Sequence, residues 1–452
     1  MKSTTRPHTP AAMGYFLTAV YSLLGLVAAF VLYVQYCKWI LWSKCRKEKL
    51  KLPPVYPGLP ILGSVFDFIR HPLHFITDVH KQLRDKALKS GASANSNLGE
   101  CFTLSIVGQR LTFLVDNDAT ETFFKPADAI FDQNEPYQFC VPIFGRGVIY
   151  DAPLDIRKAQ IKFVTDSLHQ NVLARYIPKM VQETEEYFEE KLGTQSAEFD
   201  LKDALSELII RTASSCLMGK EVRTQMFDQV SKLYDTLDKG LLPISVFLPN
   251  LPIPPHLARN KARQQMVDLF SKIISARRAA EEAALSRNEK PEEHDDVLQV
   301  FMNGKYPDGT LCTDEHVTGL MIALLFAGQH TSSVTSTWTG MLSMNDPEIW
   351  NRLVDEQRAC IHRYGNKITH EALEGMRLLH NAIKEALRMF PPLILLMRKA
   401  QQDVEFKGMT IPKGDTVVVS PALAHMLEHV FPNPKKFDPD RWDYEKHPEN
   451  LK

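Results

Sequence analysis

One long stretch, Asp314–Met344, constrains the fold of this chain more than any other. Thr313 precedes it as a helix N-cap residue, and the acids Asp314 and Glu315 suit the positive end of a helix dipole. Pro347 follows shortly after the last residue and does not continue a helix. A helix of this length measures about 46 Å, which is long enough to cross a whole domain.

The centre of this predicted helix is polar. Its unbroken apolar run covers only Leu320–Ala327, and Gly328–Ser333 follows with polar side chains in every direction. Because lipid does not accept such a segment, we expect a buried core helix and not a membrane span. The hydroxyls of Thr331 and Ser332 can donate to carbonyls four residues earlier, and Ala327 shares a face with Thr331. A partly exposed helix that tolerates polar residues is the alternative.

Composition excludes one class of partner and indicates a redox compartment. The net charge of −1 and pI of about 6.9 give no electrostatic basis for binding nucleic acid. The seven cysteines are odd in number and form no CxxC pair, which favours reduced thiols on the cytosolic side. They are Cys37, Cys45, Cys101, Cys140, Cys216, Cys312 and Cys360.

The N-terminus predicts a membrane anchor. Residues 14–36 are mostly apolar and carry no charge, and basic residues crowd 38–51, so the positive-inside rule places the body in the cytosol. A cleaved signal peptide is the alternative. The proline-rich stretch up to Pro60 is a stiff spacer. We therefore expect a tail over 1–13, a transmembrane anchor over 14–36, a basic and proline-rich linker over 37–60 and one large domain over 61–452.

The body is predicted to be mainly helical, with small sheets at its two ends. A hairpin is expected from Phe102 to Val115 around a Gly108-Gln109 turn. Helical patterns dominate from about Ala119 to Met389. A small meander is expected from Val404 to Ser420.

An aromatic loop, Tyr137–Asp151, interrupts the helical region. Its prolines and glycines argue against regular structure, and its aromatic side chains would be costly to leave in water. Lining a large apolar pocket and simple packing under the loop both remain open at this point.

Near the C-terminal end, Glu385 and Arg388 lie one helical turn apart just before Pro391-Pro392. Such pairs are often exposed and contribute little, and Glu374 with Arg377 has the same spacing. The later pair differs in its setting, because a proline-strand segment and the sequence FDPDRW follow it.

These motifs, in this order, resemble a microsomal cytochrome P-450, a haem-thiolate monooxygenase. The resemblance covers almost the whole chain. Within that family, the segments FGRGVIYD, AGQHTSS and PPLILLMRK are similar to sterol 14α-demethylases. The resemblance implies a mainly α fold with small β-sheets, in the α+β class, and a catalytic domain over 61–452.

The resemblance also implies roles for individual residues. Ala327 and Thr331 take the oxygen side of the haem, with His330 where most relatives have an acid. A histidine there is expected to deliver protons together with Thr331. The charged groups Glu385, Arg388 and Arg441 form a buried triad. Haem propionates are expected at Tyr137, Arg398 and Lys158, with Arg157 as the alternative to Lys158. The sterol pocket is expected to be lined by Phe139, Phe144, Tyr150, Leu393, Leu395 and Met397.

The implied activity is removal of the 14α-methyl group of a lanosterol- or obtusifoliol-type sterol by three successive monooxygenations. Haem b, dioxygen and electrons from NADPH through NADPH-cytochrome P-450 reductase would serve it. The implied location is the endoplasmic reticulum membrane, crossed once, with the body in the cytosol. An aromatic residue at Phe139 suggests a preference for a C4-monomethylated sterol such as obtusifoliol.

One family element is missing from the sequence as given. The resemblance implies an iron-ligating cysteine in a loop of the type F-x-x-G-x-x-x-C-x-G soon after Trp442, and the sequence reaches Lys452 without it. We expect a fragment of an active monooxygenase. The alternative is a truncated, haem-free, membrane-anchored pseudoenzyme or sterol-binding relative.

Overall fold

The structure is a computed structural model of the 452-residue chain. It describes residues 21–445 except 23–24, 26–27, 30, 37–38, 42, 44–47, 49, 61, 90–98, 126–128 and 193–197. The expected anchor over 14–36 therefore lies largely outside the described residues. Within them, one helix, Asp314–Met344, is long and apolar enough to cross a membrane, and half of its most apolar part is buried in the protein. That burial is what a core helix shows.

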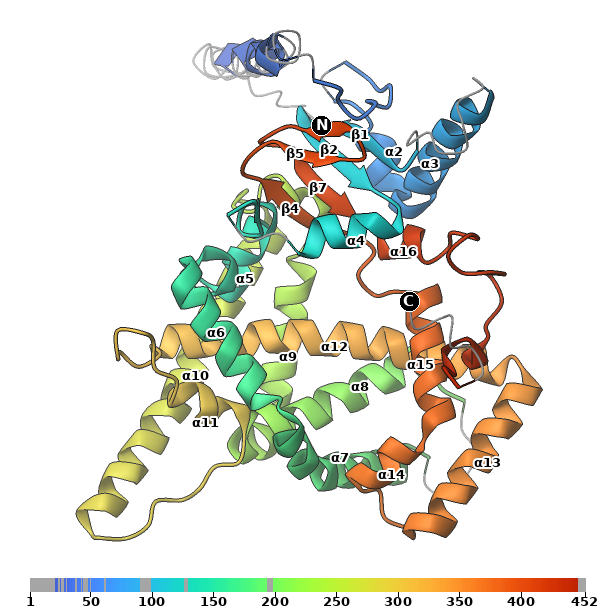
Figure 1. The fold of residues 1–452 in the computed structure, drawn as a ribbon. Coiled ribbons are helices and arrows are strands. Elements are labelled where there is room, and N and C mark those ends of the chain that lie inside the picture. Colours follow the sequence, from blue (N-terminus) through green and yellow to red (C-terminus); the bar gives the residue numbers. More distant parts are fainter. Residues whose placement is uncertain are drawn as a thin grey trace, which may run out of the picture. The chain divides into compact units, whose positions relative to one another are not determined.

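The chain divides into two compact units (Figure 1). The first unit comprises Met1–Phe131 and Lys399–Val419, and the second comprises Asp132–Arg398 and Ser420–Lys452. Helices α2 (Val65–Arg70), α3 (Pro72–Lys89) and α4 (Asn117–Phe124) belong to the first unit. The segment limits expected from the sequence stay predictions.

The predicted hairpin is present in the first unit, with its turn one residue earlier than expected. Strands β1 (Cys101–Ile106) and β2 (Gln109–Leu114) pair antiparallel. The turn residues are Val107 and Gly108, with φ of 49° and 78°, and not Gly108 and Gln109. Two left-handed residues suit a tight hairpin because their twist matches that of the flanking strands.

The meander predicted from Val404 to Ser420 is wrong. Strands β5 (Val404–Phe406) and β6 (Met409–Ile411) form a separate antiparallel pair, and β7 (Thr416–Val419) pairs parallel with β2. Every residue of β7 is buried, which requires a place inside a sheet. The larger sheet has the order β1-β2-β7-β4-β3, and the chain passes between the units within β3 (Phe131–Asp132) and β4 (Leu396–Ala400).

The carboxylate of Asp415 fixes β7 beside β2. It lies immediately before β7 and accepts hydrogen bonds from Arg110 Nε at 2.8 Å and Thr112 Oγ1 at 2.6 Å. Asp415 is only 2% exposed, so its charge requires these donors. The register of the parallel pair, Leu111 with Thr416 through Leu114 with Val419, follows directly from that anchor.

The second unit is helical, and helix α12 (Asp314–Met344) runs through its middle, packed against α8, α10 and α15 (Figure 1). The fold is thus mainly α with small β-sheets, as predicted. The remaining elements are α5 (Val141–Phe144), α6 (Leu154–Ser167), α7 (Gln170–Leu192), α8 (Leu201–Ala213), α9 (Phe227–Lys239), α10 (Pro254–Ser286), α11 (Val297–Met302), α13 (Pro347–Tyr364), α14 (His370–Gly375), α15 (Arg377–Met389), α16 (Pro421–Ala424), η1 (Glu135–Cys140), η2 (Ile149–Asp151), η3 (Ser214–Met218), η4 (Val222–Met226), η5 (Pro243–Val246) and η6 (Pro439–Trp442).

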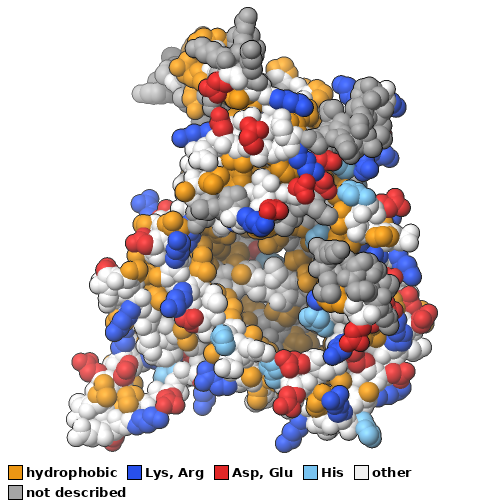
Figure 2. Space-filling model, in the orientation of Figure 1, with side chains coloured by type: hydrophobic (Ala, Val, Ile, Leu, Met, Phe, Trp, Pro, Cys, Tyr) orange, Lys and Arg blue, Asp and Glu red, His pale blue; other side chains and the backbone are white. Residues whose placement is uncertain are grey.

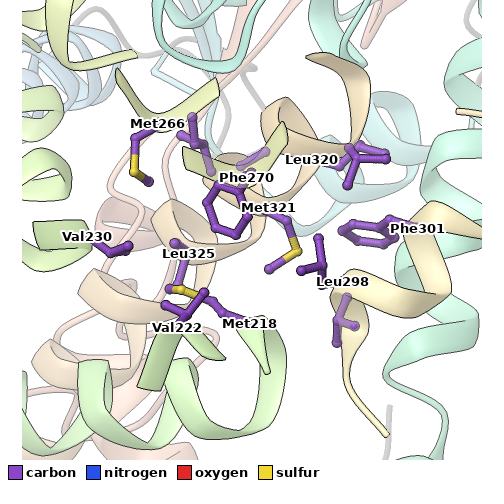
Figure 3. Packing of buried hydrophobic residues seen from close by; sticks show 14 of the residues in the cluster. Met218, Val222, Val230, Met266, Phe270, Leu298, Phe301, Leu320, Met321 and Leu325 are labelled. Atoms are coloured by element: carbon purple, nitrogen blue, oxygen red, sulfur yellow. The ribbon is translucent and has the colours of Figure 1, made fainter. Parts of the chain in front are cut away.

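The N-terminal half of α12 forms the core of this unit. Leu320, Met321 and Leu325 are at most 1% exposed and belong to one cluster with Phe270 of α10 and Phe301 of α11 (Figure 3). Burying each such side chain contributes about 1.5–3 kcal/mol to folding. The bounds of α12 match the sequence prediction, because the Thr313 side chain caps it by accepting from the His316 backbone N–H at 3.2 Å.

The aromatic segment 137–151 is more regular than the sequence indicated. It contains η1, α5 and η2 in succession, although its prolines and glycines argued against regular structure. Pro136 and Pro142 stand in the first turns of η1 and α5, where a missing N–H costs nothing. Gly145 and Gly147, with φ of 109° and 69°, separate the short helical turns. The prolines therefore begin these turns instead of preventing them.

Candidate active site

The centre of α12 is exposed, whereas its N-terminal half is buried. Ala327 and Gly328 are exposed, and a side chain added at Gly328 would meet no atom within 4 Å. Thr331 Oγ1 donates to the carbonyl of Ala327 at 2.5 Å, as predicted for a mid-helix threonine, while the helix stays α-helical. Figure 2 shows a hollow in the second unit beside α5, with hydrophobic side chains visible in it.

His330 is bound to a carboxylate of another helix. Its Nε2 lies 2.9 Å from Oδ1 of Asp238, in the last turn of α9, and its side chain is 50% exposed. This hydrogen bond raises the pKa of His330 above its usual 6.5. The Tyr234 hydroxyl, one turn earlier on α9, donates to Oε1 of Gln329 at 3.4 Å. Sequence reasoning missed Asp238, because no motif marks one acid among the several on α9.

The three charged residues of the predicted triad meet at one buried carboxylate. Glu385 is fully buried and accepts from Nε and Nη2 of Arg388, each at 2.9 Å. Nε of Arg441 lies 3.3 Å from the same carboxylate. Two guanidinium groups thus face one buried carboxylate.

Further donors around Glu385 were not foreseen. Nε1 of Trp442 donates to it at 2.9 Å and the backbone N–H of Asp438 at 3.2 Å. Arg388 uses its remaining donors on the carbonyls of His425 at 3.0 Å and Pro434 at 2.8 Å. Because nearly every polar atom is satisfied, the charges are stable in a buried position, and they tie α15 to the segment after α16.

Two of the three predicted propionate ligands lie together. Tyr137 Oη accepts from the backbone N–H of Met397 at 3.2 Å, and this leaves its own O–H free to donate. Burial raises the pKa of Tyr137, and the nearby charge of Arg398 opposes that shift. Lys158 is exposed on α6, whereas its neighbour Arg157 is buried and pairs with Asn134.

The aromatic residues of the predicted pocket form one cluster. Tyr150 stacks on Tyr137 with ring centroids 4.8 Å apart and lies 6.2 Å from Phe144. Phe139 lies 5.9 Å from Tyr137. The structure adds Phe326 of α12, 6.0 Å from Phe144, which the sequence did not single out. The cluster therefore joins the segment 137–151 to α12.

The segment after α15 supplies the aliphatic part of the predicted pocket. Leu395 and Met397 are half-buried, and Met397 is held by the bond to Tyr137 described above. Leu393 is 57% exposed. All three lie between α15 and the end of β4, within the second unit.

The cysteines in the described residues are free thiols. Burial raises the pKa of Cys101 and of Cys140 to about 12 and that of Cys216 to about 11, and burial also raises the pKa of Cys312. These four thiols are therefore protonated at neutral pH. Cys360 is buried on α13.

Comparison with known proteins gives a consistent result. The family model for cytochrome P-450 matches residues 53–452. The chain is 41% identical to the obtusifoliol 14-alpha demethylase of Sorghum bicolor, over 93% of this chain and 80% of the relative. It is 41% identical to the sterol 14-demethylase of Arabidopsis thaliana, over 92% and 81%. It is 34% identical to the lanosterol 14-alpha demethylase of Cunninghamella elegans, over 86% and 72%.

A solved structure shares the fold. Retinoic acid bound cyanobacterial CYP120A1 matches with a TM-score of 0.69 and 23% identity, over 87% of this chain and 82% of that chain. Together with the family match over residues 53–452, these similarities identify the chain as a member of the cytochrome P-450 family, whose cofactor is haem, in the group of the sterol 14-alpha demethylases.

Proposed function

We propose that the protein removes the 14α-methyl group of an obtusifoliol-type sterol by three successive haem-dependent monooxygenations. The observation that carries the proposal is the pair His330 and Asp238, placed one residue from Thr331 on the open centre of α12. The titratable ring of His330 and the hydroxyl of Thr331 are thus neighbours in sequence on the exposed part of α12. Delivery of protons to bound dioxygen needs such a donor and such a hydroxyl.

The residues present fit the rim and the oxygen side of a haem. The free phenol O–H of Tyr137 and the guanidinium of Arg398 suit carboxylates, and the exposed Ala327 and Gly328 leave room for a flat group. A bound haem supplies the dioxygen chemistry. The cysteine loop of the type F-x-x-G-x-x-x-C-x-G, which would supply the thiolate to the iron, does not occur among the described residues.

Protons are delivered in this proposal along Asp238, His330 and Thr331. His330 is half exposed and takes its proton from solvent, and the Asp238 carboxylate stabilises the charged ring. Thr331 spends its O–H on the Ala327 carbonyl, and its oxygen remains an acceptor. When this hydroxyl rotates away from the carbonyl and gives its proton towards the open face, its oxygen accepts the replacement proton from the charged His330, which is recharged from solvent.

The pocket binds the sterol by excluding water from an apolar ring system. Tyr150, Phe144 and Phe326 present aromatic surface, and their ring contacts fix one another's orientation. The sequence preference drawn from Phe139 is for a C4-monomethylated sterol. The 41% identity to the Sorghum bicolor obtusifoliol enzyme, against 34% to the Cunninghamella elegans lanosterol enzyme, supports the same preference.

The proposal includes haem b, dioxygen, and NADPH-cytochrome P-450 reductase as electron donor, with a single-pass anchor in the endoplasmic reticulum membrane. The test is a binding titration of the complete protein with obtusifoliol and with lanosterol, followed by product analysis with NADPH and reductase. Tighter binding of obtusifoliol and loss of its 14α-methyl group are expected. Sterol binding without product, and without the carbon monoxide spectrum of a thiolate haem, would instead indicate a non-catalytic sterol-binding protein.

Replacing Thr331 by alanine is expected to uncouple electron consumption from product formation. The substitution removes the hydroxyl next to His330 but leaves the helix intact, since the lost bond to Ala327 was intrahelical. Product per NADPH consumed should fall several-fold while sterol binding is retained. Thr335→Ala is the control, because Thr335 makes the equivalent bond to the Thr331 carbonyl one turn further on. Unchanged coupling in Thr331→Ala would remove Thr331 from the proton path.

A further inference from the structure

A largely buried polar network is hydrogen-bonded to the backbone of the segment 145–151. It consists of Gln160 of α6, Tyr306 and Cys312 of the turn after α11, and His316 of α12. Gln160 is fully buried, Cys312 is 1% exposed and Tyr306 is 7% exposed. None of these residues takes part in the site described above.

Gln160 is held in one orientation by the backbone of the segment. Its Oε1 accepts from the N–H of Ile149 at 2.8 Å, and its Nε2 donates to the carbonyl of Gly147 at 2.8 Å. A flipped amide would face both backbone groups with the wrong atom. Ile149 has φ of 45°, a conformation that a β-branched residue rarely adopts, so this bond holds a strained residue in place.

The hydroxyl of Tyr306 then determines the state of His316. The Tyr306 oxygen accepts from Nε2 of Gln160 at 3.2 Å and from Sγ of Cys312 at 3.1 Å, which fills both of its lone pairs. Its own O–H is then left for Nδ1 of His316, 2.9 Å away, and we assign Nδ1 as the acceptor, in agreement with the lowered pKa of this half-buried ring. This assignment makes His316 a neutral imidazole with its proton on Nε2.

The first turns of α12, which contain His316, also contact the segment directly. A side chain added at Gly147 would come within 2.7 Å of Nε2 of His316, and one added at Gly319 within 2.2 Å of the Phe144 carbonyl. The segment thus rests against α12 with no space between them. It has little freedom to move unless the polar network changes.

We propose that Gln160, Tyr306 and a neutral His316 act as positioning residues, which hold the segment 145–151 against α12 and thereby fix Tyr150 for the sterol. Tyr150 follows Ile149 directly, and its ring stacks on Tyr137. The link to the sterol rests on the function proposed above. The link between the network and the segment rests only on the hydrogen bonds.

Within the described residues, the charged groups near His316 come from α12, α10 and the segment 145–151. Glu315 precedes it on α12, Arg263 of α10 lies near Glu315, and Asp151 accepts from the N–H of Gly147 within the segment. Burial lowers the pKa of His316 below 6.5, against the opposing effect of Glu315. The network is therefore complete above pH 6.5 and is lost as the pH falls through the lowered pKa, because a protonated His316 cannot accept from Tyr306.

The test is backbone hydrogen exchange of the full chain over residues 145–152, expressed as protection relative to the free-peptide rate at each pH. We expect protection of the Ile149 N–H to fall by up to tenfold per pH unit as the pH decreases from 6.5 to the lowered pKa of His316, and to level off below it. Tyr306→Phe should lower protection roughly two- to tenfold at pH 7.5, the effect of one hydrogen bond. His316→Asn keeps an acceptor for Tyr306 but does not titrate, so its protection should not change with pH.

His362→Asn is the matched control, because His362 is exposed on α13 outside the network. It should behave as the unmodified protein. Wild-type protection in Tyr306→Phe, or an unchanged pH dependence in His316→Asn, would overturn the proposal. If Tyr306→Phe does not fold, the His316→Asn comparison decides.

Measurements of sterol binding and turnover separate this inference from the proposed function. In the complete protein, Tyr306→Phe should raise the sterol dissociation constant and KM several-fold and leave kcat nearly unchanged. A protein that shows the exchange pattern but binds no sterol would refute the proposed function and leave the network in place. Sterol binding with no effect of Tyr306→Phe on exchange or affinity would refute the network.

Discussion

Replacing Glu385 by alanine is expected to destabilise the second unit by about 3–5 kcal/mol, the usual cost of removing one partner from a buried ion pair. The substitution leaves Arg388, which is 1% exposed, without a carboxylate. It also removes the acceptor of Trp442 Nε1 and of the Asp438 N–H. The unfolding midpoint in urea measures the effect, and the complete protein should fail to incorporate haem.

The chain offers a matched control for this experiment. Glu374 has the same spacing to Arg377 as Glu385 has to Arg388, but its side chain is 62% exposed. Glu374→Ala should change stability by less than about 0.5 kcal/mol. Equal effects of the two substitutions, or a normal haem spectrum from Glu385→Ala, would show that the buried carboxylate is not what holds α15 to the chain after α16.

Replacing His330 by leucine is expected to lower product formation by about 10²-fold, the lower end of what general acid–base catalysis contributes. The leucine fills a similar volume, so sterol binding should be retained while the proton source is lost. The measurement is turnover with NADPH and reductase at saturating sterol, together with the sterol dissociation constant. Turnover that remains normal would exclude His330 as the proton source.

The pH dependence of the unmodified protein tests the same pair. Asp238 raises the pKa of His330, so the protonated form persists above pH 6.5 and is lost as the pH rises through the raised pKa. Because this proposal makes protonated His330 the proton source, turnover should decline as the pH rises through the raised pKa. Asp238→Asn removes the carboxylate charge and should shift the decline to lower pH, whereas Asp235→Asn, on the exposed side of α9, should not.

Sequence reasoning reached the parts of the site that local rules govern. The cap at Thr313 and the stop before Pro347 gave α12 its observed bounds, because a helix end depends on the few residues around it. The spacing of Glu385 and Arg388 indicated that they share a face. The spacing alone could not tell a buried pair from an exposed one, because Glu374 and Arg377 have the same spacing. Only the sequence that follows Arg388 marked the later pair.

The remainder depends on contacts between distant segments. Asp238 faces His330 across 92 positions of sequence, and Trp442 reaches Glu385 across 57. The pairing of β7 with β2 was missed for the same reason, since the sequence of β7, buried throughout, does not indicate its partner strand. The short turns η1 and α5 were missed because proline was taken as a breaker, although it favours the first turn of a helix.

The parallel pairing of β2 with β7 also sets an order for biosynthesis. Thr112 and Asp415, which are hydrogen-bonded, are 303 positions apart. At about 5–20 residues per second, the ribosome delivers β7 roughly 15–60 s after β2. Throughout that interval the β1–β2 hairpin carries an unpaired, hydrophobic edge containing Leu111 and Phe113. We expect the nascent chain to need a chaperone on this hairpin, and the first unit to become protease-resistant only after β7 has emerged.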